Sequence, residues 1–143
     1  MDVDKLNADF AALADKINEL DDLDYSDERY DDLEEELHDM EDSFLEEFGD
    51  DLEDAITQVH KEFCPDNDVL LPTAYFAKNY IRLQKDHKGR HSYDVEYGEG
   101  VPVEVKNFGG QEVRLVLVPG PARLLVTVGD SAKQEAWRAR KAK

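Results

Sequence analysis

The spacing of apolar residues changes once along this chain, and that change constrains the fold more than any other feature. Up to about residue 85, apolar residues recur three and four positions apart, which is the period of an amphipathic helix. From His91 onward they alternate with polar residues, which is the period of a β-strand. A helical part followed by a strand part predicts an α+β fold, and 143 residues are the size of one domain.

The N-terminal part predicts an antiparallel helical hairpin over residues 1–48. One apolar stripe covers residues 3–20 and a second covers residues 30–48. Several aspartates separate the two stripes, and Ser26 is a favourable N-cap for the second helix. The helices have similar lengths, so we expect them to pair side by side. Gly49 should then kink or break the chain.

Two further helices are expected over residues 50–85, where they would cover a sheet. The first continues the stripe from Leu52 to Phe63 and ends before Pro65, because a proline excludes helical geometry from the preceding residue. In the second, over residues 73–85, Phe76, Tyr80 and Leu83 have helical spacing.

Residues 91–128 predict a four-stranded antiparallel meander. Glycine, proline and asparagine residues separate the strands. The expected strands are His91–Tyr97, Val101–Lys106, Gln111–Val118 and Ala122–Val128. Asp130 and Ser131 resemble a helix cap, so residues 131–143 are expected to form a short C-terminal helix that ends in a basic tail.

Charge is distributed unevenly along the sequence. Residues 1–64 carry 25 acidic side chains against four basic ones, a net charge of −21. The remainder carries +3, which gives the chain its net charge of −18. Nucleic acids and anionic lipids are recognised chiefly by clustered lysine and arginine, so the sequence argues against direct binding of either.

We therefore expect an interaction or adaptor protein that docks a basic protein surface and is not an enzyme. A narrower form of this hypothesis is that the carboxylates mimic a nucleic acid and inhibit a protein that binds one. A second copy of the chain is also considered as a partner. No cofactor is predicted, and the apparent lack of a leader and of a disulfide pair indicates a cytoplasmic protein. The candidate partner-binding residues are Glu34, Glu35, Asp39, Asp42 and Glu46.

The histidines and the single cysteine raise a weaker hypothesis of a metal site. His60 and Cys64 lie four residues apart, and His87 and His91 repeat that spacing. Whether the four converge is left open. Cys64 is not expected to be a nucleophile, because it ends a helix and the helix dipole there disfavours a thiolate.

The alternative function is a small-ligand protein or enzyme with a pocket between the sheet and the expected helix 73–85. Aromatic and basic side chains would supply its polar lining. These are Tyr75, Tyr80, Arg82, Tyr93 and Tyr97.

Residues 26–37 match the pattern S-D-x-x-Y-D-x-L-x-x-E-L. This resembles a segment of the nicotinamide-binding module of NAD-dependent DNA ligases, and the resemblance implies Tyr30 and Asp31 as ligand contacts. The K-x-D-G motif of those ligases is absent from the sequence, and a capped amphipathic helix gives the same pattern. We therefore assign no family from it.

Overall fold

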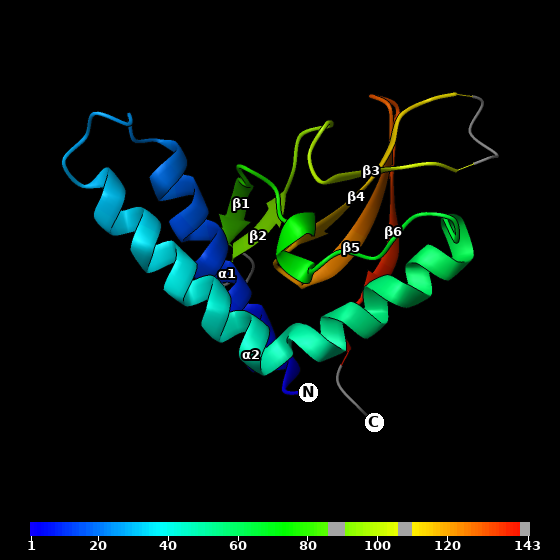
Figure 1. Cartoon of the computed structure of the whole chain (residues 1–143), viewed down its shortest axis with the longest axis horizontal. Coiled ribbons are helices and arrows are strands. Elements are labelled where there is room, and N and C mark those ends of the chain that lie inside the picture. The colour runs from blue at the N-terminus through cyan, green and yellow to red at the C-terminus, as the bar shows by residue number, and fades with distance from the viewer. Residues whose placement is uncertain (86–90, 106–109, 141–143) are drawn as a thin grey trace.

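The computed structural model describes residues 1–85, 91–105 and 110–140. Within these residues, two long helices and a short 3-10 helix precede six strands. The elements are α1 (Val3–Asp21), α2 (Tyr30–Phe63), η1 (Pro72–Tyr75), β1 (Ile81–Lys85), β2 (His91–Asp94), β3 (Val101–Val103), β4 (Val113–Val118), β5 (Arg123–Val128) and β6 (Ala132–Arg138). Figure 1 shows the helices and a four-stranded sheet, so the α+β class predicted from the sequence is confirmed.

α1 lies along the first half of α2 (Figure 1), and we call residues 3–48 the two-helix arm. The rings of Phe10 and Phe44 meet between the helices, with centroids 5.5 Å apart. Apolar side chains near the start of α1 are buried, whereas Ile17 and Leu37, nearer the tip of the arm, are only partly buried. The base of the arm is therefore part of the hydrophobic core, and its tip stands away from it.

Of the kink or break expected at Gly49, the break is wrong, because α2 is one continuous helix. Figure 1 shows that the helix bends about midway, and Gly49 lies buried inside it. A helical glycine costs about 1 kcal/mol relative to alanine. Phe48 and Leu52, on either side of it, are both buried, and their packing outweighs that cost.

The four-stranded antiparallel sheet has the order β3-β4-β5-β6 and spans residues 101–138, not 91–128. The expected C-terminal helix is wrong, because those residues form strand β6, in which Trp137 pairs with Leu124. Asp130 and Ser131 form the turn before this strand, and the Ser131 N–H donates to the Val128 carbonyl. A basic tail over the whole of 131–143 is therefore not seen, and residues 141–143 lie outside the described part.

The helix expected over residues 73–85 is also wrong. η1 occupies Pro72–Tyr75, and β1 pairs with β2 in a separate two-stranded sheet. The Asn18 side chain of α1 holds the Tyr80 backbone just before β1: its Oδ1 accepts from the Tyr80 N–H at 2.8 Å, and its Nδ2 donates to the Tyr80 carbonyl at 2.9 Å. These two bonds replace those that a helix would make there.

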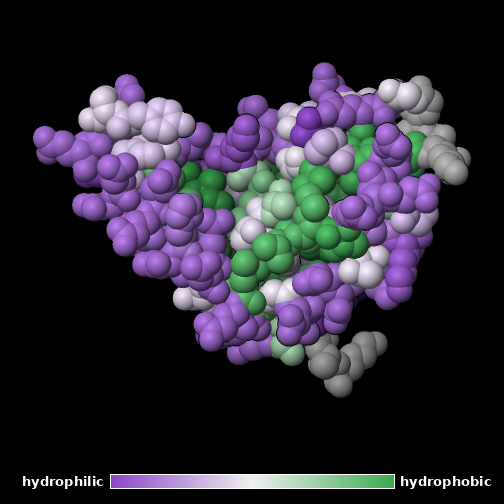
Figure 2. Space-filling model, in the orientation of Figure 1, coloured by the Kyte–Doolittle hydropathy of each residue, from purple (hydrophilic) through white to green (hydrophobic). Residues whose placement is uncertain are grey.

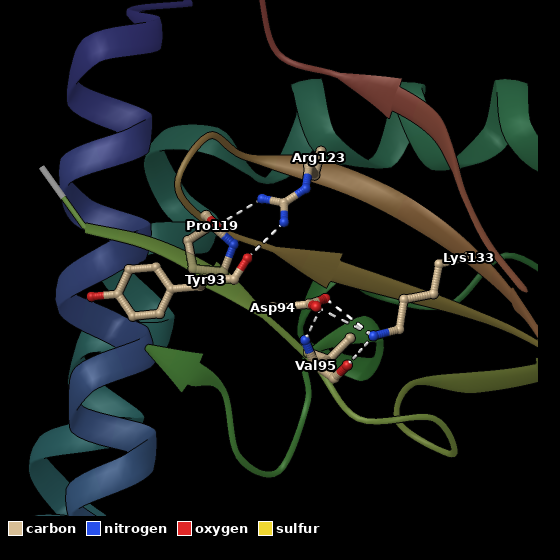
Figure 3. A network of polar contacts seen from close by, with 6 residues as sticks. All are labelled: Tyr93, Asp94, Val95, Pro119, Arg123 and Lys133. Atoms are coloured by element: carbon tan, nitrogen blue, oxygen red, sulfur yellow. Dashed lines mark hydrogen bonds and ion pairs between the residues drawn. The ribbon is translucent and has the colours of Figure 1, made fainter. Parts of the chain in front are cut away.

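Two basic side chains attach the segment around β2 to the four-stranded sheet (Figure 3). Arg123 donates to the carbonyls of Pro119 and Tyr93, at 2.9 and 2.6 Å. Lys133 donates to the Asp94 carboxylate and, at 2.5 Å, to the Val95 carbonyl. Burial lowers the pKa of Arg123, and its carbonyl partners satisfy the guanidinium inside the fold.

Substitutions along the arm should reveal its gradient of burial. Leu13 is only 1% exposed, so Leu13→Ala should lower the free energy of unfolding by about 2–5 kcal/mol. Leu37 is partly exposed, so Leu37→Ala should cost about 1 kcal/mol. Urea denaturation measures both. Equal costs, or a cost below about 0.5 kcal/mol for Leu13→Ala, would contradict the packing described here.

Candidate functional site

The predicted partner-binding residues all lie on the first half of α2. Glu35, Asp39, Asp42 and Glu46 are exposed, and their spacing of four, three and four places them along one face of the helix. Glu34 lies beside this row and is partly buried. The structure thus arranges four of the five as a linear row of carboxylates, not as a compact cluster.

Two lysines link the helices of the arm. Lys5 of α1 pairs with Asp9 and reaches Glu47 of α2 at 2.5 Å. Lys16 pairs with Glu36 of α2 at 3.1 Å. Hydrogen bonds to these carboxylates, led by Glu47 for Lys5 and Glu36 for Lys16, raise the pKa of both lysines. Sequence reasoning missed this role, although two lysines eleven residues apart in an acidic helix share a face.

A shallow groove of about 370 Å³ runs between the two helices of the arm. Its lining includes the apolar side chains of Leu13, Met40 and Phe44 and carboxylates such as that of Asp39. Of the predicted partner-binding residues, Asp39 lines this groove.

The connection between the helices exposes an aromatic pair at the tip of the arm. Tyr25 is 84% exposed and packs against Tyr30, with ring centroids 4.8 Å apart. The expected cap at Ser26 does not form, because no side-chain cap bond is made at the start of α2. Asp27 instead accepts from the backbone and guanidinium of Arg29.

The proposed metal ligands have structural roles where they are described. His60 is buried, its Nε2 lies 2.8 Å from the Tyr75 hydroxyl, and its Nδ1 lies 3.1 Å from the Asn67 carbonyl. A carbonyl only accepts, so Nδ1 carries the proton and the Tyr75 hydroxyl donates to Nε2. Cys64 is buried, and burial raises the pKa of its thiol, which disfavours the nucleophilic thiolate.

His91 does not join His60, because its Nδ1 lies 3.0 Å from the carbonyl of Leu83 in β1. His87 falls outside the described residues. Within residues 1–85, 91–105 and 110–140, no group of three or more histidine, cysteine, aspartate or glutamate side chains is placed to hold a metal ion.

The ligand pocket expected between the sheet and a helix over residues 73–85 differs from the groove that the structure has beside β1 and β2. Tyr75 and Tyr80 are fully buried, and Tyr97 contacts the Lys133 ammonium. Arg82 and Tyr93 do line a groove of about 840 Å³ between α1 and the β1–β2 sheet.

Two polar side chains of this second groove, Tyr93 and Arg82, contact the same carboxylate, that of Asp15. The Tyr93 hydroxyl donates to Asp15 of α1 at 2.7 Å, and Arg82 lies 3.9 Å from the same carboxylate. Burial and the Asp15 carboxylate raise the pKa of Tyr93 to about 12. These contacts explain how β2 is held against α1 without invoking a ligand.

Among the described residues, no helix is long and apolar enough to cross a membrane.

Removing the Tyr75 hydroxyl should destabilise the fold. Tyr75→Phe leaves the buried His60 Nε2 and the Leu70 N–H without a partner, which should lower the free energy of unfolding by about 1–3 kcal/mol. Tyr97→Phe, at an exposed position, is the control and should change it by less than about 0.5 kcal/mol. Equal effects in urea denaturation would argue against the buried network.

The raised pKa of Tyr93 predicts a loss of stability at alkaline pH. Between pH 10 and 12 the unfolded chain loses the phenolic proton while the folded chain keeps it, so the free energy of unfolding falls as pH rises. Tyr93→Phe should make this decline shallower, whereas Tyr25→Phe, at the exposed tip, should not. Chemical denaturation at pH 8 and pH 11 tests both. An unchanged slope in Tyr93→Phe would contradict the assignment.

Comparison with known proteins places the chain in no family. No family model, no curated protein and no solved structure matches it. The resemblance to DNA ligases therefore stays confined to the short segment around Tyr30, whose ring packs on Tyr25. Any assignment of function rests on the geometry and charge of the chain itself.

Proposed function

We propose that this chain is a non-catalytic interaction protein whose two-helix arm docks a basic protein surface. The observation that carries the proposal is the exposed carboxylate row on an arm whose tip stands away from the sheet. Figure 2 shows the arm as a mostly hydrophilic surface, and Figure 1 shows its tip projecting away from the four-stranded sheet. Such an element can be approached by a partner without disturbing the core.

The arm offers a partner almost no positive charge. Residues 3–48 contain 19 acidic side chains and three basic ones. Each of the three is paired with carboxylates of the arm itself: Lys5 with Asp9 and Glu47, Lys16 with Glu19 and Glu36, and Arg29 with Asp27. The outward field of the arm is therefore negative, which attracts and orients basic partners and repels phosphates.

A narrower form of the proposal is mimicry of a nucleic acid. Carboxylates three and four residues apart on a helix have β-carbons about 5–6 Å apart, so a row of them resembles a track of phosphates. The row from Glu35 to Glu46 has this spacing. A protein that binds DNA or RNA is accordingly one class of basic partner.

The alternative of a ligand pocket or an active site has weaker support. The groove beside β1 is the larger of the two grooves, but its Tyr93 donates a hydrogen bond to Asp15 and its Arg82 forms an ion pair with the same carboxylate. Cytoplasmic residence also belongs to the proposal, supported by the single, buried cysteine.

Neutralising the carboxylate row should weaken binding to a basic partner. The probe is a fluorescently labelled lysine-rich peptide, whose affinity is measured by anisotropy at low salt. Exposed ion pairs are worth about 0.2–1 kcal/mol each, so removing four charges should weaken binding about tenfold. The variant combines Glu35→Gln, Asp39→Asn, Asp42→Asn and Glu46→Gln.

A matched control neutralises four exposed carboxylates on the second half of the same helix. It should reduce affinity by less than about threefold, because those residues lie beyond the arm. Both differences should vanish near 1 M salt, where the screening length is about 3 Å. Equal losses of affinity in the two variants would contradict the assignment of the binding surface to the arm. The control combines Asp50→Asn, Asp51→Asn, Glu53→Gln and Asp54→Asn.

A further inference from the structure

An apolar patch is exposed between α2 and η1. Leu70 and Leu71 are 44% and 63% exposed, respectively. Phe63, Val69 and Phe76 are partly buried and pack against the core. We call the three consecutive residues Val69, Leu70 and Leu71 the leucine patch. Figure 2 shows green surface over η1 and the segment that leads into it, bordered by hydrophilic surface. Contiguous exposed apolar surface of this kind marks binding sites more often than single exposed leucines do.

The charge around this patch is negative. Residues 61–72 contain three acidic side chains and one basic one, Lys61. Asp66 and Asp68 are exposed within the same segment. The Asn67 side chain donates to the Glu104 carbonyl at 3.4 Å, which brings another exposed acidic residue close to the segment. A partner that covers the leucines must therefore tolerate carboxylates at the rim, and a basic one gains from them.

The patch presents side chains to a partner more than backbone groups. Phe76 forms a bridge with Leu117 of β4, so this segment already lies on the edge of the sheet. The Leu70 N–H donates to the Tyr75 hydroxyl at 3.2 Å. With those backbone groups in use, an added strand fits less well than a helix, which binds through its side chains.

A second copy of the chain fits poorly. Each copy carries a net charge of −18, so two copies facing each other through acidic surfaces repel.

We propose that the leucine patch receives the apolar face of an amphipathic, basic helix supplied by the partner. Lysines or arginines flanking that face would meet the carboxylates of the rim and of the two-helix arm. This inference rests on the proposed docking function and gives its partner a definite chemistry. Binding then has an electrostatic part that salt screens and an apolar part that salt leaves in place.

Two labelled peptides of about four helical turns test the inference. Both contain the same leucines and lysines. In one, the leucines recur three and four apart and form one face, and in the other the order is scrambled. The wild-type chain should bind the amphipathic peptide at least tenfold more tightly than the scrambled one. Near 1 M salt it should retain measurable affinity only for the amphipathic peptide. This comparison needs no variant and so does not depend on the folding of one.

Substitution then locates the contact. Leu70→Ser combined with Leu71→Ser should weaken binding of the amphipathic peptide at least tenfold and leave the scrambled peptide unaffected. Tyr97→Ser is the control, since it removes an exposed aromatic side chain from another segment. It should change neither affinity by more than about twofold, which is within the scatter of a surface substitution. Circular dichroism confirms that each variant is folded.

The alternative outcomes are distinguishable. Equal binding of the two peptides, or no effect of the leucine substitutions, would show that the leucine patch is not the site of the helix. The proposal that the two-helix arm docks a basic partner would be unaffected. Failure of both peptides to bind at low salt would overturn the docking function as well. A wild-type dimer in sedimentation, abolished by the leucine substitutions, would show that a second copy is the occupant and overturn the proposal.

Discussion

The apolar stripe of α2 packs against two different parts of the fold, and the rest of the structure depends on this packing. In its first half, Phe44 meets Phe10 of α1. In its second half, Leu52 and Ile56 belong to the same buried cluster as sheet residues such as Leu115. Because one continuous helix carries both contacts, the direction of the two-helix arm is fixed relative to the sheet. A flexible joint at Gly49 would have left the arm free to swing.

The density of carboxylates on the arm is tolerated because its base is anchored. Like charges three and four residues apart on a helix repel each other. The links from Lys5 to Glu47 and from Lys16 to Glu36 relieve part of this repulsion across the two helices. Burial of Leu6 and Phe10 also stabilises the base of the arm. Most carboxylates of the arm can therefore stay in solvent, which is the arrangement that a surface for basic partners requires.

The local spacing of apolar residues was sufficient to predict the elements that pack against the rest of the fold through a regular apolar face. The stripe from Val3 to Leu20 predicted α1, and alternation predicted strands β4 and β5 to within two residues. The exposed positions of Glu35 and Asp39 also followed from the period of the helix. By contrast, the leucine patch had no helical or strand period, and nothing in the sequence separated its exposed leucines from core residues.

The sequence by itself determined the fold class, the long helical stripes and the negative charge of the arm, because these depend on residue type and spacing within one element. Only the tertiary structure decided the conformation of residues 73–85 and 132–138. The Asn18 side chain holds the Tyr80 backbone from a distance of 62 residues, and β5 provides an edge along which Ala132–Arg138 pairs. Both segments have weak preferences of their own, so contacts made by distant residues outweigh them.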